Sequence, residues 1–158
     1  MIAGEEIGLR IDQTLTQDAT GTMAYLEFEA MGVDGVKTEK SVAYIDHNTL
    51  QTGFENADDH RYIQDRYKKA RYLFFQDPAT ASAIRFTLRR FGIPGKTLIG
   101  SEHTPQQAAE SVCFTMGAGG FDVAVAMGGG TYYIPMPKMT KLIFMAILNL
   151  GYLLKHNS

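Results

Sequence analysis

Short apolar runs that end in polar loops constrain the fold of this 158-residue chain more than any other feature. The run Ser41 to Ile45 is followed by Asp46-His47-Asn48, and the run Thr97 to Ile99 is followed by a second polar loop, Gly100 to Pro105. Short apolar runs bounded by turn-forming residues are typical of buried strands. In open α/β sheets, ligands bind where the carboxyl ends of the strands meet. The pattern therefore predicts an α/β fold with polar groups at that edge of the sheet.

Helical segments alternate with these runs. Alternating apolar and polar residues predict a strand over residues 7–11, and apolar spacing predicts a helix over about 20–31 with Asp18 as its N-cap. The polar stretch 56–69 places acids before bases, which favours a second helix. The apolar segment 121–127 fits either a helix or a strand. The chain shows no repeat and no linker, so we expect a single domain.

Charge and hydropathy exclude two classes of partner. Fifteen Lys and Arg against 17 Asp and Glu give a net charge of −2, so the chain has no overall positive field for nucleic acid or an anionic membrane. The most apolar segment, 142–154, is shorter than the roughly 20 residues that a membrane-spanning helix needs. No basic and apolar leader is visible at the start of the sequence, so we expect a cytoplasmic location.

Spacing alone leaves each candidate site residue with a structural alternative. Asp46-His47 and Glu102-His103 can each orient an imidazole for proton transfer or form a capped turn. His60 is interpreted as a solvated helix start, and Gln17-Asp18 as a helix cap. The glycines of 117–122 lack the last glycine of a dinucleotide loop and the Lys-Ser or Lys-Thr of a P-loop, which favours close backbone packing.

The only cysteine, Cys113, lies between Val112 and Phe114. One cysteine cannot form an intramolecular disulfide, and one thiolate cannot build an iron–sulfur site by itself. Its apolar neighbours favour a buried, structural thiol.

Five blocks of sequence carry a more specific signal. They are residues 7–24 (IGLRIDQTLTQDATGTMA), 42–51 (VAYIDHNTLQ), 54–61 (FENADDHR), 91–101 with 103–105 (FGIPGKTLIGS and HTP) and 117–127 (GAGGFDVAVAM). In this order they closely resemble the N-terminal region of the aconitase and isopropylmalate dehydratase superfamily, with the aconitase branch favoured.

The resemblance implies a hydro-lyase that interconverts citrate and isocitrate through cis-aconitate with the help of a [4Fe–4S] cluster. It implies that Gln17 contacts the substrate, that Asp46 and His47 bind substrate and take part in catalysis near the cluster, and that His103 is catalytic. No residue of this chain matches a metal ligand, because the cluster's cysteines belong to parts of the family beyond the matched segment.

The chain departs from the family pattern at residues 65–90, 106–116 and 142–158. The family has Gly-Ser-Asp-Ser-His-Thr-Pro where Gly100 to Pro105 is one residue shorter, and its Gly-Ile-Cys-His-Gln block is absent. Shifting the reading frame of the codons for Pro78 to Thr87 permits that missing block. Our hypothesis is that the chain is a frame-slipped, early-ended piece of such an enzyme.

These observations predict one partial domain over residues 1–158, a three-layer α/β/α arrangement with a mostly parallel sheet that corresponds to a fragment of the family's N-terminal domains. We expect it to retain part of a pocket for a small di- or tricarboxylate. We expect no activity from the chain alone, because the rest of the enzyme is missing from it. The alternative is a cluster-free α/β module that binds an anionic ligand through Gly117 to Gly120, or that docks to a partner lyase subunit.

Overall fold

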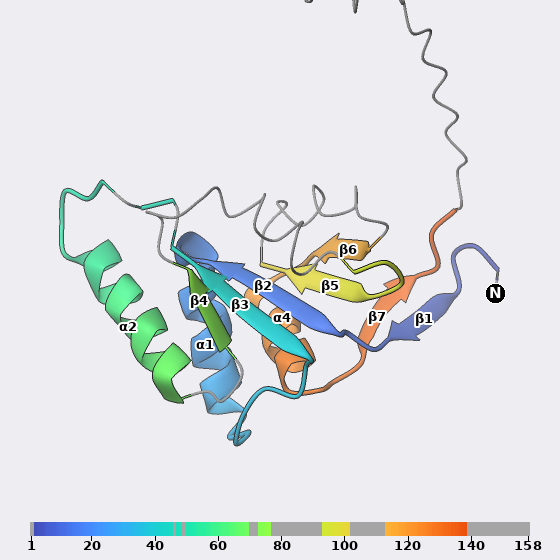
Figure 1. Cartoon of the computed structure of the whole chain (residues 1–158). Helices are drawn as coiled ribbons and strands as arrows, with labels where there is room; N and C mark the ends of the chain where they lie inside the picture. The colour runs from blue at the N-terminus through green and yellow to red at the C-terminus, as the bar shows by residue number, and fades with distance from the viewer. Residues whose placement is uncertain are drawn as a thin grey trace, which may run out of the picture.

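A five-stranded parallel sheet lies at the centre of the computed structural model, which describes residues 2–45, 47–48, 50–69, 73–76, 93–101 and 113–138 (Figure 1). Its strands run in the order β4-β3-β2-β5-β6. They are β2 (Gln13–Gln17), β3 (Lys40–Tyr44), β4 (Leu73–Gln76), β5 (Thr97–Gly100) and β6 (Phe114–Gly117). The described helices are α1 (Asp18–Ala30), α2 (Glu55–Lys69) and α4 (Gly120–Met127). The predicted α/β class with a parallel sheet is confirmed.

The side on which successive strands are added to the sheet changes at the central strand, β2. From β2 the chain adds β3 and then β4 on one side, and it continues with β5 and β6 on the other side. Where the order reverses, the connections leave neighbouring strands in opposite directions and open a crevice at their carboxyl ends. In this sheet the order reverses between β2 and β5, so a ligand site is expected beyond the carboxyl ends of these two strands.

The sequence pattern did not predict the central strand, β2. Residues 13–17 are mostly polar, yet all five are buried. Their hydroxyl groups find partners inside the fold: Thr14 Oγ1 lies 2.6 Å from Ser41 Oγ, and Thr16 Oγ1 lies 2.7 Å from the Tyr25 hydroxyl. Buried polar groups are tolerated when they are hydrogen-bonded. These pairs join β2 to β3 and to α1.

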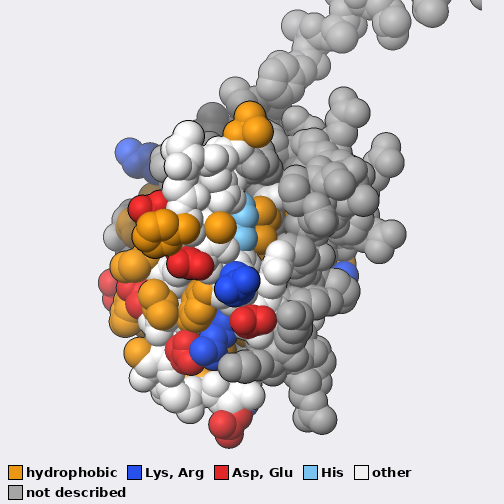
Figure 2. Space-filling view, turned by 90° about the vertical axis from the view of Figure 1, so that its left-hand side faces the viewer, with side chains coloured by type: hydrophobic (Ala, Val, Ile, Leu, Met, Phe, Trp, Pro, Cys, Tyr) orange, Lys and Arg blue, Asp and Glu red, His pale blue; other side chains and the backbone are white. Residues whose placement is uncertain are grey.

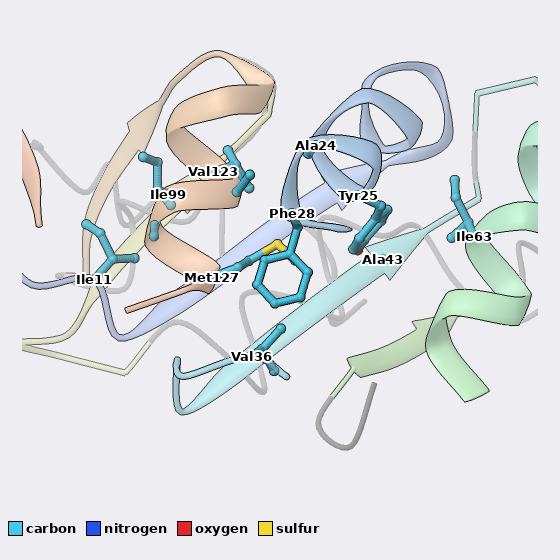
Figure 3. Packing of buried hydrophobic residues seen from close by; sticks show 12 residues of the cluster. Ile11, Ala24, Tyr25, Phe28, Val36, Ala43, Ile63, Ile99, Val123 and Met127 are labelled. Atoms are coloured by element: carbon cyan, nitrogen blue, oxygen red, sulfur yellow. The ribbon is translucent and has the colours of Figure 1, made fainter. Parts of the chain in front are cut away.

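Both faces of the sheet are buried. On one face, helices α1, α2 and α4 cover an apolar cluster (Figure 3) that contains Tyr25, Phe28, Ile63, Ile99 and Met127. On the opposite face, a second cluster consists of Leu15, Val42, Tyr44, Leu98 and Cys113. A parallel sheet that is buried on both faces is what a three-layer fold requires. The described helices all belong to the first face, so the second helical layer stays a prediction.

The other predicted elements compare with the structure as follows. The helices expected over 20–31 and 56–69 are confirmed as α1 and α2, and 121–127 is helical. The strand expected over 7–11 is β1 (Glu6–Leu9), which pairs antiparallel with β7 (Tyr132–Pro135). The expectation that Asp18 caps α1 is wrong, since Asp18 is the first helical residue and Gln17 occupies the N-cap without a side-chain hydrogen bond.

The segments 65–90, 106–116 and 142–158, which match the family poorly, lie largely outside the described residues. The frame-slip hypothesis therefore stays a prediction. Among the helices that the structure describes, none is long and apolar enough to cross a membrane.

Helices α1 and α4 approach each other closely at a glycine. A Cβ atom on Gly120 would lie 3.3 Å from the backbone nitrogen of Ala24 and 3.2 Å from Glu27 Oε2. This contact supports the packing interpretation of the glycine-rich segment. It also places a carboxylate beside the first turn of α4, where an anionic ligand would have to bind in the alternative reading.

We predict that Gly120→Ala lowers the free energy of unfolding by about 1–3 kcal/mol, because the added methyl group forces the two helices apart. The matched control is Gly119→Ser. A Cβ there meets nothing within 4 Å, and serine is a preferred residue at this N-cap position, so the control should unfold at the same or a higher urea concentration. Equal destabilisation by both substitutions would contradict the close packing of α1 on α4.

Candidate functional site

The candidate site is organised around the carboxylate of Asp18, which is fully buried at the start of α1. Its Oδ1 atom accepts a hydrogen bond from the backbone N–H of His47 at 3.1 Å. Its Oδ2 atom accepts one from the backbone N–H of Asn48 at 2.8 Å, and Oδ2 also lies 2.9 Å from Nε2 of His60. Three N–H groups from two other segments thus converge on one carboxylate, which is how proteins accommodate a buried charge.

His60 is therefore not the solvated helix start that the sequence suggested. Its side chain is only 15% exposed, and both ring nitrogens have partners. Nδ1 lies 3.1 Å from the side-chain nitrogen of Gln51, which also donates to the carbonyl oxygen of Asn48 at 2.8 Å. Sequence spacing could not reveal this role, because Asp18 and His60 are 42 residues apart.

His47 lies between this buried carboxylate and solvent. Its Nδ1 atom is 3.8 Å from Asp18 Oδ1, and its side chain is 44% exposed. Figure 2 shows histidine atoms reaching the surface on the side of the molecule that carries α2. A carboxylate beside an imidazole orients the ring and stabilises its positive charge, as required of a group that gives or takes a proton.

Gln17 is the last residue of β2, at the point where the strand order reverses between β2 and β5. It is 2% exposed, and its side-chain oxygen has no hydrogen-bond partner within the described part of the chain. At the same edge, Thr20 Oγ1 and Ser101 Oγ lie 2.6 Å apart and connect α1 to the residue after β5. The edge thus combines an amide, two hydroxyl groups and an imidazole, all of which can bind the oxygen atoms of a small hydroxy acid.

The structure brings together only some of the predicted site residues. Gln17 ends β2 and His47 follows the neighbouring strand β3, so both lie at the same edge of the sheet. Asp46 and His103 lie outside the described residues, so their predicted roles stay predictions. Asp18, which the sequence suggested only as a helix cap, is the residue that organises the site.

The described residues do not fit an iron–sulfur cluster. The whole sequence has one cysteine, and Cys113 belongs to the apolar cluster with Leu15 and Leu98 and donates to the carbonyl oxygen of Lys96 at 3.1 Å. Burial raises the pKa of the Cys113 thiol, and the charge of Asp12 raises it further. A cluster needs several thiolates. In the part of the chain that the structure describes, no three His, Cys, Asp or Glu residues are grouped to hold a metal ion either.

Because its pKa is raised, the Cys113 thiol should stay protonated at pH 8 and react slowly with a disulfide reagent. We expect the folded chain to react at least about tenfold more slowly than the same chain in denaturant, where the thiol returns to its ordinary pKa of about 8.5. A single cysteine makes this assay unambiguous. Equal rates in the two conditions would show that Cys113 is not buried as described.

Known proteins with similar sequences are large subunits of one enzyme. The chain is 28% identical over 151 residues to the 3-isopropylmalate dehydratase large subunit of Caldanaerobacter subterraneus subsp. tengcongensis, covering 94% of this chain and 36% of that protein. It is 29% identical over 145 residues to the protein of the same name in Thermodesulfovibrio yellowstonii, covering 89% and 34%. The large subunit 1 of Thermotoga maritima is 26% identical over 141 residues.

No protein-family model matches the chain. The chain spans about a third of the length of the curated relatives. The similarity nevertheless extends through 89% or more of the chain. Sequence similarity and the parallel α/β sheet together relate this chain to the aconitase and isopropylmalate dehydratase superfamily, in keeping with its N-terminal part.

Proposed function

We propose that this chain forms part of the substrate pocket of a hydro-lyase of this superfamily, which acts on a small hydroxy di- or tricarboxylate. One observation carries the proposal. Gln17 is the last residue of β2 and His47 follows β3, so the two residues that the resemblance assigns to substrate binding both lie at the carboxyl edge of the sheet. Ligands of open α/β sheets bind at this edge. Asp46 and His103 follow β3 and β5 in the sequence and belong to the same proposed pocket.

A hydro-lyase removes a proton from one carbon of its substrate and a hydroxyl group from the next. The proton needs a base, and the departing hydroxyl needs an acid. In the proposed pocket His47 holds or moves a proton, since its exposed imidazole lies next to the Asp18 carboxylate. The Gln17 amide orients the substrate through its side-chain oxygen, which can accept a hydrogen bond from the substrate's hydroxyl group. The described residues of this chain do not supply the ligands of a cluster.

The substrate is the finer part of the proposal. The motif blocks favour the aconitase branch and hence citrate or isocitrate, whereas the relatives are named for 3-isopropylmalate. Both acids combine a hydroxyl group with at least two carboxylates and suit the same polar edge. The relatives are also named large subunits, so we propose that the complete protein has a partner subunit.

Titration of the ¹⁵N-labelled full chain with citrate, isocitrate and 3-isopropylmalate tests this pocket. Chemical shift changes should gather at Gln17, His47 and Ser101. Gln17→Met removes the amide while keeping the size of the side chain, so it should weaken binding about tenfold, the effect of one lost hydrogen bond. Gln64→Met, on the exposed side of α2, is the matched control and should bind as the unmodified chain does.

Two results would contradict the proposal. One is a set of shift changes confined to Gly119 and Gly120 at the start of α4, which would favour the anion-binding module. The other is a stoichiometric cluster with isocitrate turnover after incubation of the purified chain with iron and sulfide. That result would show that the chain holds a complete site rather than part of one.

A further inference from the structure

His60 has no role in the function proposed above, although the structure places it beside the site. We propose that His60 is a positioning residue: acting through Asp18 and Gln51, it fixes the peptide at His47 and thereby the direction from which the His47 imidazole enters the pocket. The inference rests on the proposed function, because it assumes that His47 faces the substrate.

The hydrogen bonds around His60 determine which ring nitrogen carries the proton. Gln51 Nε2 is a donor, and it lies 3.1 Å from His60 Nδ1 while also donating to the carbonyl oxygen of Asn48. Reversing the Gln51 amide would place its oxygen against that carbonyl, so the nitrogen must face the ring. His60 Nδ1 is then the acceptor. The proton therefore sits on Nε2, which donates to Asp18 Oδ2 at 2.9 Å.

This hydrogen bond holds the Asp18 carboxylate against the backbone that follows β3. Asp18 Oδ2 accepts from both His60 and the backbone of Asn48, and Oδ1 accepts from the backbone of His47. His60 thus fixes the carboxylate that binds two successive peptide groups. Gln51 binds the same short segment from its other side, through the carbonyl of Asn48. The segment after β3 is held at three backbone atoms, all linked to one imidazole.

His60 itself lies on a helix that is packed against the core. His60 belongs to α2, whose next turn inserts Ile63 into the apolar cluster that also contains Tyr25 of α1. A histidine on a packed helix has little freedom to move. Catalytic side chains need positioning to within a fraction of an ångström, and loops reach it through supporting hydrogen bonds from rigid elements.

Two NMR measurements on the full chain test the proposal. Long-range ¹H–¹⁵N correlations should show His60 in the Nε2–H form. Hydrogen exchange should then compare His60→Leu, which loses the donor, with His60→Gln, whose side-chain nitrogen can reach Asp18 as Nε2 does. We expect His60→Leu to speed exchange of the His47 and Asn48 amides at least about tenfold, and His60→Gln to restore most of the protection.

Exchange at Val42 in β3 is the internal control, since a merely structural loss would speed it equally. Gln64→Leu, one turn further along α2, is the matched variant and should leave all these amides unchanged. Equal exchange in His60→Leu and the unmodified chain, an Nδ1–H form of His60, or a failure of glutamine to rescue would each overturn the proposal. Because none of these readouts uses a substrate, they can fail while citrate binding succeeds, and the reverse.

Discussion

The buried carboxylate of Asp18 is the interaction on which the rest of the site depends. A carboxylate removed from water is strongly destabilising unless hydrogen-bond donors replace its hydration shell. Here the donors come from the backbone after β3 and from α2, while the carboxylate itself begins α1 directly after the central strand. The Asp18 side chain thus connects the end of β2 to the segment after β3 and to helix α2. The arrangement of this edge of the sheet follows from satisfying that charge.

The elements with regular patterns could be predicted from the sequence, and the central strand could not. Helices α1 and α2 follow from apolar spacing and charge order. Strand β2 escaped because Thr14 and Thr16 carry hydroxyl groups to a buried surface, where Ser41 and Tyr25 bind them. Those partners belong to β3 and α1 and become visible only when the chain is folded. A polar strand is predictable only together with the neighbours that satisfy it.

Some residues of the site could likewise be predicted from the sequence, and others could not. Gln17 and His47 were found through their resemblance to a family motif, and the structure places both at the carboxyl edge of the sheet. Asp18 lies in the same motif block as Gln17, and His60 lies in the block at 54–61, but the two were interpreted as a cap and as a solvated residue. Their shared contact links positions 42 residues apart, which no local pattern encodes. Sequence reasoning located the edge of the sheet, and the structure identified the group that organises it.

Urea denaturation of Asp18→Asn tests most directly whether the buried Asp18 carboxylate holds this edge of the sheet together. Asparagine keeps the shape of the side chain, but its amide nitrogen replaces one acceptor with a donor, which faces either the His47 N–H or the N–H groups of Asn48 and His60. We expect the free energy of unfolding of the variant to be about 2–4 kcal/mol lower than that of the unmodified chain, because buried donors lose their charged partner. A value within about 0.5 kcal/mol of the unmodified chain, the usual range for an exposed substitution, would contradict it.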